Sequence, residues 1–194
     1  MRVVLWIVGE PGAGKTSLAR ALLGPNPLVT SSVSPKWTLS IPPGVVAAGH
    51  YTGGTFDGAD TISYSGGAAA IDWWAENVSA PLTILDGDRL SNRNTIARLM
   101  REPVILACAY LELRSEIAAE RRAARGSDQN ASWVKGRSTK ARRFFESFPG
   151  AIRITLDGEL PPDVLAREIH EQIEASREAT ERLPEVGGLP AVAR

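Results

Sequence analysis

The chain has 194 residues, of which 43% are hydrophobic and 23% charged, and its formal net charge is zero. This composition is ordinary for a folded globular protein, and no apolar run approaches the roughly 18 residues of a membrane span. Balanced charge over the whole chain also argues against a general nucleic-acid-binding protein. We expect one domain over residues 1–182, a flexible tail over residues 183–194 and no signal peptide. A single cysteine favours a reducing, cytoplasmic setting.

The first predicted elements are an apolar strand over residues 3–8, a glycine-rich loop and a helix over residues 15–23. The loop reads GEPGAGKT, which is the spacing of a phosphate-binding P-loop. Backbone N–H groups and the positive end of the helix dipole meet there, so we predict a nucleoside triphosphate site. Lys15 is expected on the β- and γ-phosphates, and the Thr16 hydroxyl on Mg²⁺. The residues predicted to bind the nucleotide are Gly9, Pro11, Gly12, Ala13, Gly14, Lys15, Thr16 and Ser17.

The next segment is rich in serine, threonine and glycine. Residues 28–40 predict a strand with a Ser/Thr loop, and residues 45–62 predict a short hairpin or ordered loop. Asp57 and Asp60 lie in this second stretch. A kinase benefits from a carboxylate that accepts the proton of the acceptor hydroxyl, and we prefer Asp60 for this catalytic role. The alternative is that both aspartates only shape a surface turn.

A helix over residues 68–78 and an apolar strand over residues 82–85 follow. The strand ends at Asp86, the form of a Walker B carboxylate, so Asp86 is predicted to hold Mg²⁺ opposite Thr16. The alternative is that Asp86 only caps the next turn. Asp88 is a second candidate for contact with substrate or metal, unless it pairs with Arg89. Ser91 is the predicted N-cap of the next helix.

The second half predicts a strand over residues 103–111, a charged helix over residues 112–125 and a turn over residues 127–132. A helix from Trp133, a strand over residues 151–156 and a final helix from residue 161 complete the chain. Trp133 is expected to anchor this part in the core; the alternative is a stacking surface for a base.

The segment from Arg121 to Arg143 holds eight basic residues and one acidic residue, a local charge of about +7. We therefore predict an Arg-rich helical lid over residues 114–148. Arg121, Arg125 and Arg137 would stabilise the negative charge of phosphoryl transfer when this lid closes. The alternative is that several of these arginines line the solvated face of a helix. Alternation of strands and helices predicts an α/β P-loop NTPase fold, with a parallel sheet covered by helices on both faces.

These motifs together resemble the nucleotide and nucleoside kinase branch of P-loop proteins, which implies a five-stranded parallel sheet of order 2-3-1-4-5. More narrowly, the segments GHYTGGTFDGADTIS, ILDGDRLSN and QNASWVKGRSTKARR resemble phage-encoded P-loop kinases that phosphorylate 5-hydroxymethyluracil within DNA. This narrower resemblance implies ATP and Mg²⁺ as cofactors, DNA with modified thymine or uracil bases as partner, and the cytoplasm of a host cell.

By the same resemblance, Lys15 and Thr16 hold ATP·Mg²⁺, and Asp60 and Asp88 lie near the substrate hydroxyl. Lys135 and Arg137 then belong to the lid. Some relatives have a glutamate where this chain has an aspartate in LDGD, which leaves the metal ligand open between Asp86 and Asp88.

Two other functions are compatible with the motifs. The first is a kinase for a free nucleoside, a nucleotide or another small hydroxyl compound, which needs the same phosphate machinery. The second is a nucleotide-dependent switch or binding module. No Asn/Thr-Lys-x-Asp motif for reading guanine occurs, and the chain is short for a ring ATPase with a second helical subdomain. The sequence leaves the oligomeric state open.

Overall fold

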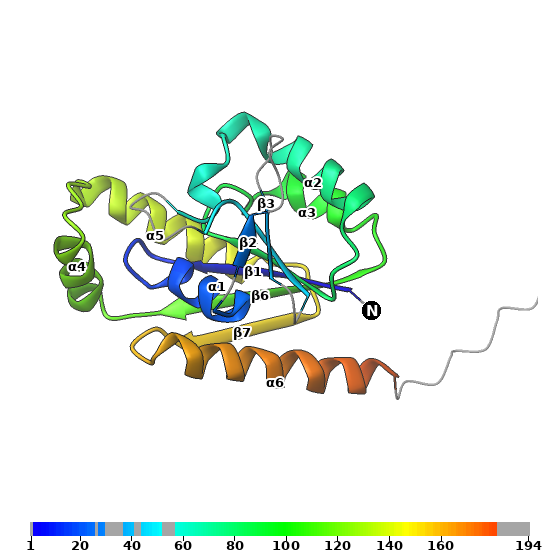
Figure 1. Cartoon of the computed structure of the whole chain (residues 1–194). Helices are drawn as coiled ribbons and strands as arrows, with labels where there is room; N and C mark the ends of the chain where they lie inside the picture. The colour runs from blue at the N-terminus through cyan, green and yellow to red at the C-terminus, as the bar shows by residue number, and fades with distance from the viewer. Residues whose placement is uncertain (1, 26, 30–36, 41–43, 52–56, 182–194) are drawn as a thin grey trace, which may run out of the picture.

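The computed structural model describes residues 2–25, 27–29, 37–40, 44–51 and 57–181. It shows one seven-stranded sheet with the strand order β2-β3-β4-β5-β1-β6-β7, covered by helices (Figure 1). The strands are β1 (Arg2–Gly9), β2 (Pro27–Val29), β3 (Trp37–Ser40), β4 (Val45–Ala48), β5 (Leu82–Asp86), β6 (Val104–Glu112) and β7 (Ile152–Asp157).

Five of these strands, β4, β5, β1, β6 and β7, are parallel neighbours. Their order in the sheet follows the implied 2-3-1-4-5 pattern when they are numbered along the chain. The prediction of five strands is nevertheless wrong for the whole sheet, because β3 pairs antiparallel with β4 and β2 pairs antiparallel with β3. The sheet is therefore mixed.

The parallel strand β4 lies in a stretch where the sequence predicted a hairpin or loop. All four residues of β4 are buried, and they pair in parallel with β5. A strand buried on both faces shows no alternation of apolar and polar residues, and this one is only four residues long, so the surrounding glycines concealed it. The predicted strand over residues 28–40 corresponds to the two antiparallel strands β2 and β3, of which β2 is at the edge of the sheet, and residues 30–36 lie outside the described part of the chain.

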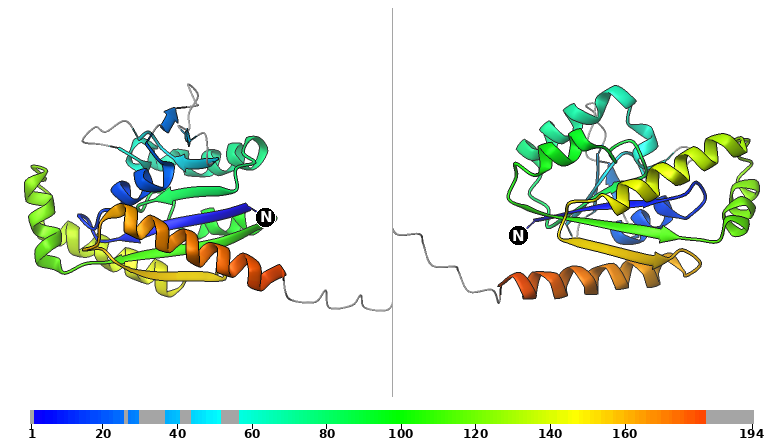
Figure 2. Two further views of the ribbon diagram at one scale, coloured as in Figure 1. Left: turned by 60° about the horizontal axis from the view of Figure 1, so that its bottom comes forward. Right: turned by 180° about the vertical axis from the view of Figure 1, so that it is seen from behind.

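Helices cover both faces of the sheet, as predicted. Helices α1 (Lys15–Leu23) and α6 (Pro162–Glu181) lie on one face, and α2 (Gly67–Asn77), α3 (Arg93–Leu99) and α5 (Ala131–Glu146) lie on the other (Figures 1 and 2). Helix α4 (Ser115–Ala124) stands beyond the end of the sheet. Among the described residues, no helix has the length and apolar character needed to span a membrane.

A separate apolar core fills each face. The α1–α6 side is mostly aliphatic, with Leu18 and Leu22 of α1 and Ile169 of α6 fully or almost fully buried. The opposite side is built around Trp6, whose ring contacts Phe148 at a centroid distance of 5.3 Å. Burial of this apolar surface is the main force that holds the helices on the sheet.

Two helix starts differ from their predictions. The N-cap of α3 is Asn92, whose Oδ1 accepts a hydrogen bond from the Thr95 N–H at 3.0 Å. Ser91 instead donates its hydroxyl to the Gly87 carbonyl at 2.6 Å, which closes the turn after β5. Helix α4 begins at Ser115 rather than at residue 112, because β6 continues to Glu112. The predicted tail over residues 183–194 lies outside the described residues.

Because the five parallel strands run the same way, their carboxyl ends meet at one end of the sheet. The glycine-rich loop follows β1, Asp86 ends β5, and α4 follows β6 at this end (Figure 1). In open α/β sheets, ligands bind outside the carboxyl ends of the strands. The fold therefore collects the residues singled out in the sequence at one location.

Candidate phosphate and metal site

The loop between β1 and α1 has the backbone that the motif predicts. Gly9, Gly12 and Gly14 all have positive φ angles, of 154°, 96° and 95°. At Gly12 space is also decisive, since a Cβ there would lie 2.6 Å from the Ala118 carbonyl oxygen of α4. The glycine loop is therefore in close backbone contact with α4, a contact that only glycine permits.

Lys15 lies along the loop that precedes it. Its Nζ donates to the carbonyl oxygens of Gly9 at 3.0 Å and Glu10 at 2.8 Å. Burial lowers the pKa of Lys15 to about 8, an effect that Asp86 and Asp60 oppose and Arg125 reinforces. The side chain thus supplies a largely desolvated ammonium at the loop, where a phosphate oxygen would be its natural partner.

Asp86 is held by three donors although it is only 3% exposed. Its Oδ2 accepts a hydrogen bond from Thr16 Oγ1 at 3.0 Å. Its Oδ1 accepts from the Tyr51 hydroxyl at 2.6 Å and from the Ala59 N–H at 2.8 Å. Burial raises the pKa of Asp86, and the hydrogen bonds from Tyr51, Ala59 and Thr16 act in the opposite direction. Asp86, rather than Asp88, is the carboxylate that faces Thr16.

The pair formed by Thr16 and Asp86 fits a magnesium ion. Mg²⁺ binds oxygen at about 2.0–2.1 Å in octahedral geometry, so neighbouring ligand oxygens lie about 2.9 Å apart. Thr16 Oγ1 and Asp86 Oδ2 are 3.0 Å apart. The described residues contain no cluster of three or more His, Cys, Asp or Glu side chains suited to a metal. Mg²⁺ does not need one, because it is commonly held by one or two protein oxygens, substrate phosphates and water.

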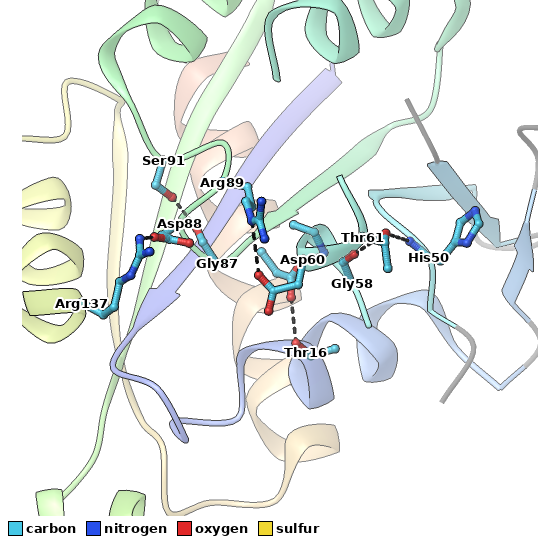
Figure 3. Close-up of polar contacts among 12 residues, drawn as sticks. Thr16, His50, Gly58, Asp60, Thr61, Gly87, Asp88, Arg89, Ser91 and Arg137 are labelled. Carbon is cyan, nitrogen blue, oxygen red and sulfur yellow. Dashed lines mark hydrogen bonds and ion pairs between the residues drawn. The ribbon is translucent and has the colours of Figure 1, made fainter. Parts of the chain in front are cut away.

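The two aspartates of the 45–62 segment have different surroundings. Asp57 is buried and forms an ion pair with Arg20 of α1, so it fastens the segment to that helix. The Asp60 side chain is 63% exposed and lies 3.6 Å from Arg89 Nε (Figure 3). Asp60 is also near enough to Lys15 to raise the pKa of that ammonium. Of the two candidates, Asp60 is the one whose carboxylate is exposed.

Asp88 is held by α5. Its carboxylate forms an ion pair with Arg137 (Figure 3). The carboxylate also lies 3.5 Å from Lys140 Nζ, which donates to the Asp88 carbonyl at 3.3 Å. The sequence offered Arg89 as a partner of Asp88, and Arg89 Nε lies 3.6 Å from Asp60 Oδ1. Asp88 and Arg137 thus connect the end of β5 with the first half of α5.

The arginines of α4 are directed toward the glycine loop. Arg122 Nη1 donates to the Pro11 carbonyl at 2.5 Å, and Arg121 Nη1 donates to the Gly158 carbonyl at 2.8 Å. The same Arg121 nitrogen lies 3.8 Å from the position that a Cβ on Gly14 would occupy. Arg125 is exposed and donates to the Arg121 carbonyl at 3.2 Å. The guanidinium groups of Arg121 and Arg122 therefore border the loop.

Helix α5 carries the remaining predicted residues. Trp133 is 39% exposed, so its predicted role as a core anchor is wrong. It lies in the first turn of α5, where the Arg137 guanidinium stands 5.0 Å from its ring centroid. Lys135 is exposed on the outer side of α5. Closure of residues 114–148 over the site stays a prediction.

Sequence reasoning missed the role of Tyr51, which contacts Asp86, and that of Arg20, which pairs with Asp57. Tyr51 lies three residues beyond the end of β4. If residues 45–48 had been recognised as a parallel strand, Tyr51 would have been a candidate site residue, because residues just after such strands line the ligand end of the sheet.

No protein-family model matches the chain, and no curated protein matches it either. Several solved structures do match the chain. The chain is similar to a sugar kinase from Janibacter sp. HTCC2649, with 18% identity, 90% of this chain and 95% of that chain covered, and a TM-score of 0.53. It is also similar to a tunicamycin resistance protein from Deinococcus radiodurans, with 18% identity, coverage of 89% and 96%, and a TM-score of 0.54. An uncharacterized protein from Eubacterium ventriosum matches with 11% identity, coverage of 90% and 99%, and a TM-score of 0.51.

At these identities the likeness concerns the fold. The chain has an α/β fold with a mixed sheet, and this fold is similar to that of the sugar kinase and of the tunicamycin resistance protein.

Proposed function

We propose that the protein is an ATP-dependent kinase that transfers the γ-phosphoryl group to a hydroxyl. The observation that carries this proposal is the convergence of four side chains at one end of the sheet: Lys15 on the glycine loop, the Thr16–Asp86 pair, and the exposed Asp60. A phosphate-binding loop and a magnesium-ligand pair are common to P-loop proteins. An accessible carboxylate beside them adds what an acceptor hydroxyl requires.

In the proposed reaction the acceptor oxygen forms a bond to the γ-phosphorus as the bond between that phosphorus and the β,γ-bridging oxygen breaks. ADP leaves, and the hydroxyl proton passes to a carboxylate. The glycine-loop N–H groups and Lys15 stabilise the phosphate charge, and Thr16 with Asp86 would hold Mg²⁺, which neutralises the β- and γ-phosphates when bound.

Asp60 is the carboxylate best suited to accept the proton. It is exposed, next in sequence to Ala59, which contacts Asp86, and within electrostatic reach of Lys15. Asp88 has two cations beside its carboxylate, Arg137 and Lys140. Because its carboxylate is occupied by these two side chains of α5, we assign Asp88 to the positioning of α5.

Residues 114–148 serve as the lid in this proposal. Arg122 of α4 donates to the Pro11 carbonyl of the glycine loop, Arg125 lies within electrostatic reach of Lys15, and Arg137 of α5 pairs with Asp88. Arg121 donates to the Gly158 carbonyl, and its Nη1 lies 3.8 Å from the position of a Cβ on Gly14. Closure of these helices would bring guanidinium groups to the γ-phosphoryl group and exclude water, which strengthens every electrostatic interaction there.

The narrower candidate for the acceptor is the 5-hydroxymethyl group of 5-hydroxymethyluracil in DNA. Besides the resemblance in sequence, it is supported by the basic outer surface of α5, where a shallow depression of about 520 Å³ is lined by Ser132, Lys135, Gly136, Thr139, Lys140 and Arg143. Clustered cations of this kind suit a phosphodiester backbone. The alternative is a free nucleoside, a nucleotide or another small hydroxyl compound, which the similarity to a sugar kinase favours.

Incubation with γ-labelled ATP separates these acceptors. The panel contains 5-hydroxymethyluracil DNA, thymine DNA, free nucleosides, mononucleotides and simple sugars. Label on the modified DNA alone supports the narrower proposal, and label on a small compound alone supports the alternative. Nucleotide binding without transfer to any acceptor would leave a nucleotide-dependent switch as the function.

Replacement of the proposed base gives a sharper prediction. Asp60→Asn should lower kcat by about 10²- to 10⁴-fold, the usual contribution of general base catalysis, and leave nucleotide affinity unchanged. Asp72→Asn is the matched control, because Asp72 is also an exposed aspartate paired with an arginine, Arg98, but lies on α2. Steady-state kinetics on both variants check this. Equal kcat for Asp60→Asn and Asp72→Asn would remove Asp60 from the reaction.

A further inference from the structure

The buried hydroxyl of Tyr51 has no part in the proposed reaction, yet it contacts the carboxylate assigned to the metal. Tyr51 is 4% exposed, and its hydroxyl donates to Asp86 Oδ1 at 2.6 Å. The Ala59 N–H donates to the same oxygen at 2.8 Å. The other oxygen, Oδ2, accepts from Thr16 Oγ1.

The two oxygens of Asp86 therefore have separate tasks. Oδ1 is saturated by two donors from the segment that follows β4, and Oδ2 faces the hydroxyl that would share the metal. We propose that Tyr51 is a positioning residue: its hydroxyl fixes the rotation of the Asp86 carboxylate, so that Oδ2 alone is presented to the metal. This inference rests on the proposed function, because it concerns the same magnesium site.

The surrounding backbone makes Tyr51 a rigid donor. The Gly58 N–H donates to the His50 carbonyl at 2.5 Å, which joins the two sides of the segment. A Cβ on Gly49 would lie 2.0 Å from the Gly58 carbonyl oxygen, and a Cβ on Gly58 would lie 2.8 Å from Asp86 Oδ2. Residues on both sides of the carboxylate are thus packed without room for a side chain, and Tyr51 has little freedom to move away.

The same segment carries the proposed base. Asp60 directly follows Ala59, one of the two donors to Oδ1, and Asp57 fastens the segment to α1 through Arg20. The orientation of the Asp86 carboxylate and the placement of the proposed base therefore both depend on the backbone at Ala59 and Asp60. Groups that orient a metal ligand commonly change metal affinity about 10- to 100-fold when they are removed.

The test is Tyr51→Phe, which removes one hydroxyl and keeps the ring that fills the core. Mn²⁺ binding to the protein in the presence of ADP is measured by electron paramagnetic resonance, and ADP affinity is measured without metal by equilibrium dialysis. We expect about a tenfold or greater loss of Mn²⁺ affinity, with the metal-free ADP affinity and the melting temperature unchanged. A merely structural role for Tyr51 would weaken nucleotide binding or lower the melting temperature instead.

Tyr110→Phe is the matched control. Tyr110 is 7% exposed and lies near the end of β6, where its ring contacts Phe145 and Arg142. Its loss should leave Mn²⁺ affinity unchanged.

Three outcomes would overturn the inference. If wild-type protein binds Mn²⁺ with ADP and Tyr51→Phe binds it equally well, the positioning role fails and the proposed function stands. If both tyrosine variants weaken Mn²⁺ binding alike, the effect does not come from Asp86. If wild-type protein binds no Mn²⁺ with ADP, the magnesium site fails and the positioning role fails with it.

Discussion

Lys15 and Asp86 are two ionisable residues of the site whose pKa values are shifted by burial. Burial lowers the pKa of the Lys15 ammonium and raises the pKa of the Asp86 carboxyl group. In both cases the protein disfavours the charged form that phosphate or metal would require. Under the proposed function, a bound polyphosphate with its divalent ion would supply the missing opposite charges to these desolvated groups.

Lys15 leads to a prediction on pH. Its pKa is about 8 in the free protein, below the ordinary value of 10.5. Nucleotide phosphates bind the ammonium form, so Mg·ATP affinity should be constant below pH 8 and fall by up to about tenfold per pH unit above it. Between pH 8 and pH 10.5 the free energy of unfolding of the nucleotide-free protein should instead rise with pH. In this range Lys15 binds a proton in the unfolded chain but not in the folded protein.

Calorimetric titration between pH 7 and pH 9.5 measures this affinity, and Lys15→Arg is the control because a guanidinium stays charged throughout. The variant should bind Mg·ATP with the same affinity at both ends of that range. If the Mg·ATP affinity of the wild type also stays constant between pH 7 and pH 9.5, the lowered pKa of Lys15 is contradicted.

Sequence reasoning at this scale depended on how close together the functional residues are in the chain. The glycine loop was predictable because its ligands are contiguous and each has a mechanical reason to be there. Asp86 was predictable as the end of an apolar strand. Tyr51 was not, since its contact with Asp86 crosses 35 positions and depends on how β4 is placed beside β5.

At the scale of elements, α4 and the glycine loop form one unit. Gly12 meets the Ala118 carbonyl of α4, and Arg122 reaches back to the Pro11 carbonyl. The loop cannot take its shape independently of α4, and a change at Gly12 acts on both.

Gly12→Ala tests this coupling. The added Cβ would lie 2.6 Å from a backbone oxygen and force an alanine to a φ of 96°. We expect a destabilisation of about 2–4 kcal/mol from strain and overpacking together, with loss of nucleotide binding.

Gly126→Ala separates the two causes, because Gly126 has a φ of 65° with no atom within 4 Å of the added Cβ. It should cost only about 1 kcal/mol. Chemical denaturation of both variants measures the difference, and equal losses would show that α4 does not press on the loop.

The elements themselves were predicted unevenly. Helix α1 has the predicted bounds, because a glycine loop precedes it and Gly24 ends it. Helix α5 was also predicted from its apolar spacing, but the position of Trp133 was not. Apolar periodicity identifies the face of a helix that packs, and it does not show that the first turns of α5 extend past the sheet. Strand β4 was missed since four buried residues among glycines give no periodic signal.

At the scale of the whole molecule, the fold brings separate parts of the chain to one end of the sheet. The glycine loop, the segment after β4, Asp86, α4 and the loop after β7 all follow parallel strands that point the same way. Alternation of strands and helices predicted this arrangement, and the right-handed crossover rule limited the possible strand orders. Residues 28–40 were predicted as one strand with a loop, and the alternation of strands and helices did not show that β2 and β3 extend the sheet antiparallel beyond β4.

The most direct test of this account is calorimetric titration of the whole protein with Mg·ATP, beside Lys15→Ala and Asp86→Asn. We predict saturable binding to the wild type with a dissociation constant between about 1 µM and 1 mM, the range in which kinases commonly bind substrates. Lys15→Ala should not bind Mg·ATP. Asp86→Asn should still bind ATP, but with an affinity that no longer depends on magnesium. Absence of binding to the wild type, or equal binding by all three proteins, would contradict the phosphate and metal site at the carboxyl end of the sheet.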